Sequence, residues 1–112
     1  MPNQPVKLDR VFHALADPTR RAVVERLGSG PAPTLELARP FRMALPSFTQ
    51  HLGVLESCGL VRSRKKGRTR TYELAPRPLK MVETWLTMQR ALWERRLDQL
   101  DDYLKGLKER KP

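Results

Sequence analysis

The sequence has a single cysteine and few aromatic residues. Its one cysteine, Cys58, excludes an internal disulfide, and aromatic residues make up only 6% of the 112 residues. No apolar run approaches the ~20 residues that a membrane-spanning helix needs, and the first eight residues lack the apolar core of a signal peptide. These absences predict a soluble cytoplasmic protein without a membrane partner.

Residues that carry out catalysis or bind metal ions are also scarce. The chain has two histidines, His13 and His51, and it has no Gly-rich phosphate loop and no nucleophile beside a base. A zinc-type site needs three or four converging Cys, His or carboxylate ligands. The two histidines and Cys58 are not gathered on one predicted element, and no histidine accompanies the acids near residue 100. We therefore expect no enzyme, no metal site and no cofactor.

Basic residues, by contrast, are abundant and concentrated in one segment. The formal net charge is +10 and the isoelectric point is about 10.7, which predicts a polyanionic partner. Removing the six cations of residues 62–70, a segment without an acid, would lower the net charge to +4. We expect these six to contact DNA phosphates: Arg62, Arg64, Lys65, Lys66, Arg68 and Arg70. The alternative is a solvated basic hairpin.

Apolar spacing and helix-breaking residues predict a mainly α chain with a small β-hairpin, an α+β fold forming one domain over residues 1–112. A flexible arm at 1–5 precedes a first helix near 6–16. Asp17 can cap a second helix, with Pro18 at its first position. A Gly- and Pro-rich loop follows this helix.

Residues 34–74 predict a winged helix-turn-helix, in which one helix enters the major groove and a hairpin lies on flanking phosphates. The helix-turn-helix covers 34–58: Thr34 caps a short helix, and Pro46 begins a longer helix that ends at Cys58, before Gly59. The wing covers 60–74, with Gly67 in its turn.

The longer helix of this pair is the predicted reading helix, because it combines one apolar face with one short-polar face. Base or phosphate contacts are expected from Ser47, Thr49, Gln50 and His51. The Gln50 amide can pair with adenine through two hydrogen bonds. The alternatives are that Gln50 meets only DNA backbone or water, that Thr49 leans inward, and that His51 is a polar packing residue. Arg20 and Arg21 have three open roles: contacting DNA backbone, bonding within their helix, or facing solvent.

A long last helix is predicted near residues 79–108, after Pro76 and Pro78 break the chain. Its apolar residues recur with nearly heptad spacing, interrupted by Gln89, which predicts a helix–helix seam between two copies. The expected dimer interface, shared with the first helix, consists of Leu8, Phe12, Leu79, Val82, Leu86, Trp93, Leu97, Leu100 and Leu104. A second stripe, which includes Trp85 and Met88, predicts core packing or a small-molecule pocket.

The chain resembles the ArsR/SmtB family of transcriptional regulators over about residues 6–105. The resemblance is carried by the order and spacing of short motifs: Leu15-Ala16-Asp17-Pro18-Thr19-Arg20-Arg21, Glu36-Leu37-Ala38, His51-Leu52, Val54-Leu55-Glu56, Gly59-Leu60-Val61 and Gly67-Arg68. Further motifs are similar to a subgroup without the usual metal ligands: Pro40-Phe41, Met43, Leu45-Pro46, Trp85, Trp93, Arg96-Leu97, Leu100 and Tyr103-Leu104.

This resemblance implies a homodimeric repressor of the ArsR type that does not sense metal and binds a near-palindromic operator in double-stranded DNA. It also implies release on a signal, from an unknown small-molecule or protein inducer. The chain departs from the subgroup at Ala44, where a serine is common, and at Gln50 and Gly53, where lysines are common. Two other functions stay open: a ligand- or partner-protein-responsive regulator, and a non-specific nucleic-acid or nucleoid-binding module.

Overall fold

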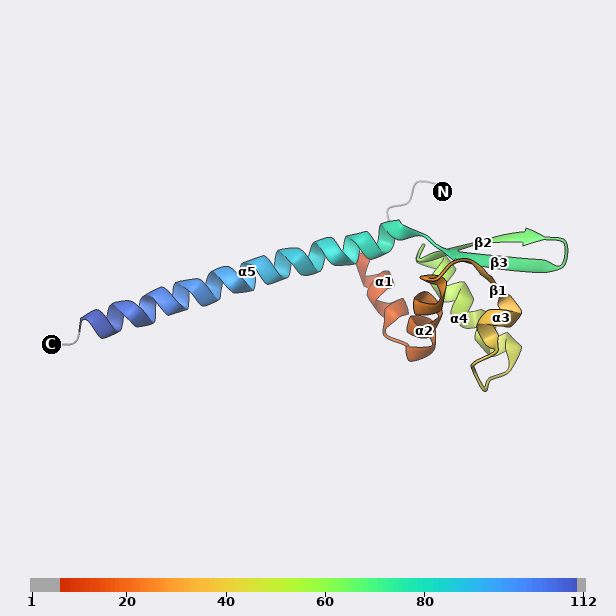
Figure 1. Cartoon of the computed structure of the whole chain (residues 1–112), viewed down its shortest axis with the longest axis horizontal. Helices are drawn as coiled ribbons and strands as arrows, with labels where there is room; N and C mark the ends of the chain where they lie inside the picture. The colour runs from red at the N-terminus through yellow and green to blue at the C-terminus, as the bar shows by residue number, and fades with distance from the viewer. Residues whose placement is uncertain (1–6, 111–112) are drawn as a thin grey trace. The chain divides into compact units, whose positions relative to one another are not determined.

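The computed structural model describes residues 7–110, so the arm expected at residues 1–5 lies outside the described residues. It confirms a mainly helical fold with a β-hairpin and a long C-terminal helix (Figure 1). The elements are α1 (Leu8–Leu15), α2 (Pro18–Leu27), β1 (Ala32–Pro33), α3 (Thr34–Ala38), α4 (Leu45–Ser57), β2 (Val61–Lys66), β3 (Thr69–Leu74) and α5 (Pro76–Glu109). The chain divides into two compact units, which are Met1–Met81 and Val82–Pro112.

The core of the first unit forms around α4. Phe48, Leu52 and Leu55 repeat at helical spacing on one face of α4, and all three are fully buried. Helices α1, α2 and α3 and strand β2 each contact α4. Most of the other buried apolar residues come from these neighbours, from the sheet and from the turn after α4: Val11, Ala14, Val23, Leu27, Ala32, Leu37, Cys58, Leu60, Val61 and Tyr72. Pro78 in the first turn of α5 is also buried. Burial of one face leaves the other face of α4 open to solvent.

The sheet has one more strand than the sequence predicted. Its order is β1-β3-β2, with all neighbours antiparallel, and Ala32 pairs with Tyr72 in β3. Strand β1 has only two residues within a Gly- and Pro-rich loop, too short to show the alternation that identifies strands. The expectation that Thr34 caps α3 is wrong, because its hydroxyl donates instead to the Arg70 carbonyl of β3 at 3.3 Å.

Local signals placed most helix ends correctly. The Asp17 carboxylate accepts a hydrogen bond from the Arg20 backbone N–H at 3.1 Å, with Pro18 first in α2. Gly59 has a φ of 83°, a conformation open to glycine, and it ends α4 as expected. The expectation that Pro76 and Pro78 precede the last helix is wrong. Helix α5 begins at Pro76, because the first N–H groups of a helix have no partner and proline's missing N–H costs little there.

Within the second unit, α5 carries a long stripe of exposed apolar side chains. Trp93 is 60% exposed, Leu97 58%, and Leu100 52%, and Leu104 continues the stripe. Gln89 lies on the same stripe by its helical position. Nowhere in residues 7–110 is a helix both long and apolar enough to cross a bilayer.

Candidate nucleic-acid interface

The open face of α4 presents the predicted reading residues. Ser47, Thr49 and Gln50 are all exposed, on the side away from the buried Phe48. The Thr49 hydroxyl donates to the Pro46 carbonyl at 2.9 Å, so Thr49 does not lean inward, and its oxygen retains acceptor capacity. The side chains of Ser47 and Gln50 make no hydrogen bond to any described residue, so their polar groups are open to a partner.

Two features of α4 leave additional backbone accessible on this face. Ala44 is the N-cap of α4 and supplies no side-chain hydrogen bond to the first backbone N–H groups. Gly53 is exposed, and a Cβ added there would meet no atom within 4 Å. The backbone of α4 is therefore open around Gly53, and its first N–H groups gain no side-chain acceptor from Ala44.

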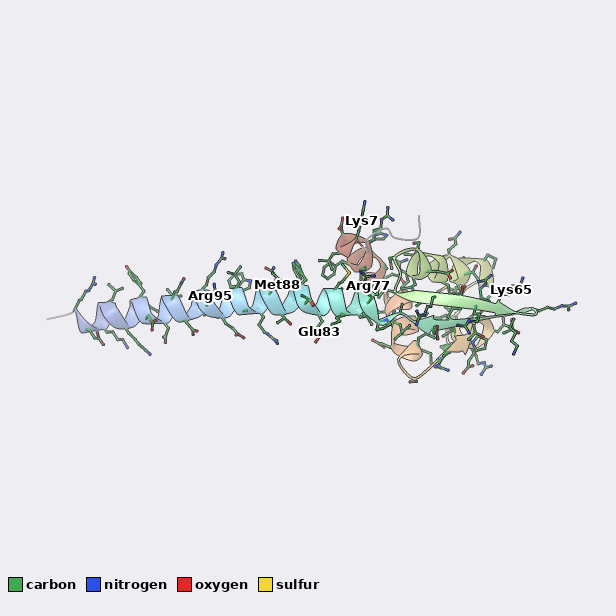
Figure 2. The ribbon with its side chains drawn as sticks, turned by 90° about the horizontal axis from the view of Figure 1, so that it is seen from above. Lys7, Lys65, Arg77, Glu83, Met88 and Arg95 are labelled. Atoms are coloured by element: carbon green, nitrogen blue, oxygen red, sulfur yellow. The ribbon has the colours of Figure 1, made fainter. Side chains whose placement is uncertain are left out.

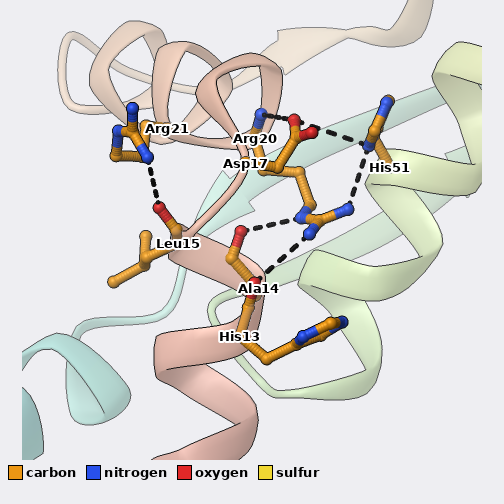
Figure 3. Close-up of polar contacts among 7 residues, drawn as sticks. All are labelled: His13, Ala14, Leu15, Asp17, Arg20, Arg21 and His51. Carbon is orange, nitrogen blue, oxygen red and sulfur yellow. Dashed lines mark hydrogen bonds and ion pairs between the residues drawn. The ribbon is translucent and has the colours of Figure 1, made fainter.

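His51, unlike Ser47 and Gln50, has a side chain that contacts other elements of the fold. Its Nδ1 lies 3.1 Å from Nη1 of Arg20 and 3.8 Å from Oδ2 of Asp17 (Figure 3). The Arg20 guanidinium also donates to two carbonyls at the end of α1, those of Ala14 at 2.7 Å and His13 at 3.2 Å. Arg20 thus joins α1, α2 and α4, which none of its three expected roles anticipated.

Arg21, next to Arg20, has a simpler role. Its guanidinium donates to the Leu15 carbonyl at 2.8 Å, and the side chain is otherwise exposed (Figure 3). The two arginines therefore cap the C-terminal carbonyls of α1, where positive charge also favours the helix dipole.

The Asp17 carboxylate adds a negative charge to the junction at which Arg20 joins α1, α2 and α4. Burial on its own raises the pKa of Asp17, but the hydrogen bond from the Arg20 backbone N–H and the favourable electrostatic interactions with His51 and Arg20 outweigh it, so the pKa lies below its usual value. Asp17 is therefore ionised at neutral pH and partly balances the Arg20 charge.

Five of the six wing cations lie on the two faces of the hairpin and the sixth, Arg68, lies in its turn; all six are exposed. Arg62, Arg64 and Lys66 alternate along one face of β2, beside a concavity of about 300 Å³ that Thr71 and Glu73 also line. On the other face Lys65 pairs directly with Arg70 across the strands. Figure 2 labels Lys65 near the outer end of the hairpin, where side chains ending in nitrogen extend from the strands.

Two of these cations have partners in the chain. Arg62 Nε lies 2.9 Å from the Glu73 carboxylate. Arg70 donates to the Ser63 hydroxyl at 2.7 Å, and Ser63 donates to the Glu56 carboxylate of α4. The side chains of the other four, Arg64, Lys65, Lys66 and Arg68, make no ion pair or hydrogen bond with the described residues. These four therefore have the most available charge.

Sequence reasoning missed both side-chain networks that hold this interface together. Glu56 and Ser63 are ordinary polar residues in the sequence, and their contact depends on how β2 packs on α4. The Asp17-Pro18-Thr19-Arg20 motif did indicate a helix start, but nothing in the sequence links Arg20 to a histidine 31 residues later.

Cys58, a candidate metal ligand together with the two histidines, has its own partner in the core. Cys58 is buried, and its thiol donates to the Leu55 carbonyl at 3.3 Å. Across residues 7–110 no three His, Cys, Asp or Glu side chains gather closely enough to hold a metal ion.

Comparison with known proteins places this arrangement in a family. A family model described as a helix-turn-helix domain matches residues 15–64. The HTH-type transcriptional regulator Rv2034 of Mycobacterium tuberculosis is 47% identical over 76 residues, which are 68% of this chain and 71% of that protein. The transcriptional repressor SdpR of Bacillus subtilis is 29% identical over 79 residues, covering 70% of this chain and 88% of SdpR.

A solved structure agrees with these relatives. The crystal structure of an ArsR family transcriptional regulator superposes with a TM-score of 0.76 at 54% identity, covering 78% of this chain and 96% of the other. On its sequence, its fold and its exposed reading helix and basic wing, this chain belongs to the ArsR family of winged helix-turn-helix, DNA-binding transcriptional regulators.

Proposed function

We propose that this regulator is a homodimeric repressor that reads a near-palindromic operator and does not respond to metal ions. One observation carries the DNA-reading part: the exposed polar face of α4 belongs to the same unit as a hairpin with six exposed cations. Polar side chains without charge suit base edges, and cations suit phosphates, so the two surfaces divide recognition between them.

The proposed contacts follow this division. Gln50 reads a base, Ser47 and Thr49 contact bases or phosphates, and His51 contacts a phosphate. The wing cations Arg62, Arg64, Lys65, Lys66, Arg68 and Arg70 contact backbone phosphates. Gln50 is supported as the base reader because its amide is exposed and makes no hydrogen bond to the described residues.

The test is a fluorescence-anisotropy titration against DNA from upstream of the protein's own gene and against scrambled DNA of equal length, each at two salt concentrations. We expect at least ~10³-fold tighter binding to the natural fragment at matched salt. Equal, steeply salt-dependent binding to both fragments would instead support a non-specific binding module, unless genome-wide selection of bound fragments recovers a distinct site.

Base reading by Gln50 has its own prediction. Gln50→Ala should weaken binding to the natural operator by roughly 10-fold or more, because a bidentate base contact is worth about 1–3 kcal/mol of discrimination. Binding to scrambled DNA serves as the control and should be unchanged, since no base contact is lost there. If the variant still discriminates among operators as the wild type does, Gln50 is not the base reader.

Dimerisation is supported by the apolar stripe of α5. Leu86, Trp93 and Leu97 are each more than half exposed, and their near-heptad spacing matches the seam by which two helices pair. A second copy of the same helix is the natural occupant, because a palindromic operator requires a two-fold symmetric protein. The proposed interface also includes Leu8, Phe12, Leu79, Val82, Leu100 and Leu104.

Metal independence is supported by the contacts that His51 and Cys58, two candidate metal ligands, make within the fold. His51 contacts Arg20 and Asp17, and Cys58 is buried with its thiol bonded to Leu55. Adding Zn²⁺ or EDTA should therefore leave operator affinity unchanged in the same titration. The repressor role is supported by the similarity to SdpR, which is a transcriptional repressor. In vitro transcription from the bound promoter, with and without the protein, tests this role.

A further inference from the structure

We propose that Arg20 sets the tautomer of His51, so that the reading helix presents a fixed Nε2–H donor to a DNA phosphate. Arg20 is then a positioning residue, and His51 is the contact residue. This inference rests on the proposed operator binding. It adds to that function the reason why one particular ring nitrogen of His51 faces the DNA.

The first step is the chemistry of the contact between Arg20 and His51. A guanidinium group has only donors, so the ring nitrogen 3.1 Å from Arg20 Nη1 must accept. A neutral imidazole has one accepting and one protonated nitrogen, and because Nδ1 accepts here, Nε2 carries the hydrogen. The contact therefore selects one tautomer.

The second step is the direction of Nε2. Figure 3 shows the second ring nitrogen of His51 on the side of the ring away from Arg20 and Asp17. The His51 side chain is 24% exposed. In the described part of the chain no buried side-chain nitrogen lacks a hydrogen-bond partner, and Nε2 has none, so Nε2 is open to solvent. An outside acceptor can reach it.

The third step is the rigidity of the arrangement. Arg20 is held by the carbonyls of His13 and Ala14, so its guanidinium is fixed before it meets the ring. Asp17 lies 3.8 Å from the same ring nitrogen and would accept from it if Nδ1 carried the hydrogen. Arg20 and Asp17 thus favour opposite tautomers, and the shorter contact belongs to Arg20.

We assign the acceptor as a DNA phosphate because of where His51 lies on α4 and which charges surround its ring. His51 follows Gln50 and so points ~100° away from it around the helix axis, toward α2 rather than along the centre of the reading face. The neighbouring Arg20 supplies positive charge, and the other histidine of this junction, His13, is exposed on α1. A flanking N–H donor in a positive setting suits DNA backbone.

The tautomer is tested by nitrogen NMR of the full-length protein labelled with ¹⁵N-histidine, without DNA. At neutral pH we expect the Nε2–H form of His51 in the wild type. Arg20→Met should shift His51 toward the Nδ1–H form, because Asp17 then becomes the only nearby partner of Nδ1. Arg21→Met is the matched control, since it removes the same charge and one carbonyl contact but leaves His51 untouched. The same tautomer in wild type and Arg20→Met would overturn the role of Arg20.

A second pair of variants tests the phosphate contact and does not depend on how Arg20→Met folds. The amide of glutamine reaches about as far as Nε2, whereas that of asparagine reaches only about as far as Nδ1. His51→Asn should therefore weaken operator binding by ~10-fold, while His51→Gln stays within ~3-fold of the wild type. Equal affinities of the two variants would overturn the donor role. If the wild type shows no preference for operator DNA, the proposed function is wrong. The NMR result does not depend on that outcome, because it is measured without DNA.

Discussion

Ala44 places a methyl group where a helix normally gains a hydrogen bond. It is the N-cap of α4, and no side chain there satisfies the first backbone N–H groups. Ala44→Ser should raise the free energy of unfolding by about 1 kcal/mol, because a serine oxygen can accept from the N–H two or three residues on. Urea denaturation measures this change. Ala44→Val, which adds bulk without an acceptor, is the control and should give no stabilisation.

Asp17 makes the stability of the same junction depend on pH. Its pKa is lowered from 3.8 in the folded state, so the unfolded chain takes up a proton more readily. The stabilisation is therefore fully present above about pH 4 and is lost as the pH falls through the folded pKa.

The pH effect predicts a specific result for Asp17→Asn, which can still cap α2 but cannot ionise. At pH 7 the variant should be less stable than the wild type, and by pH 3 the difference should be smaller. Urea denaturation at the two values checks this. A difference that stays constant with pH would show that the Asp17 charge does not stabilise the fold.

At the scale of elements, the parts that sequence reasoning placed correctly are those with local causes. The cap at Asp17, the terminator Gly59 and the alternating strands of the wing depend on residues a few positions apart. The two-residue β1, the contact of Thr34 with β3 and the junction of Arg20 with His51 depend on packing between distant segments. No short pattern in a single sequence contains that information.

The reading face shows the same limit. Its exposed residues could be predicted from helical periodicity, because Phe48, Leu52 and Leu55 define the buried side. Helical periodicity could not predict that His51 contacts Arg20 while the Gln50 side chain stays without a partner, because both residues are polar neighbours on one helix.

The wing predicts unequal contributions from its cations to DNA binding. Lys66→Gln should reduce the slope of log affinity against log salt by ~0.9, because one phosphate contact of an unpaired cation is lost. Arg62→Gln should reduce it less, since Arg62 already pairs with Glu73 at 2.9 Å. Anisotropy titrations over a salt series measure these slopes. Lys108→Gln, near the end of α5, is the matched charge control, and a similar reduction there would count against wing-specific contacts.

At the scale of the whole molecule, the apolar stripe of α5 predicts the assembly state. Leu97→Lys combined with Leu100→Lys should give monomers in analytical ultracentrifugation, because two buried charges would face their own copies across the seam. Ala91→Lys, which lies away from the stripe, should remain dimeric. A dimer that survives the double substitution would exclude this stripe as the interface.

Gln89 gives this stripe a further consequence, which concerns competition among related subunits. In a parallel, in-register pairing of two α5 helices, the two Gln89 amides would lie at the same level and could satisfy each other's hydrogen bonds. A paralogue with leucine at that level of its helix would leave the amide buried and unsatisfied, so a mixed pair would be penalised. One polar residue in an apolar stripe would thus keep related regulators in the same cell from exchanging subunits, and each operator would answer to its own protein.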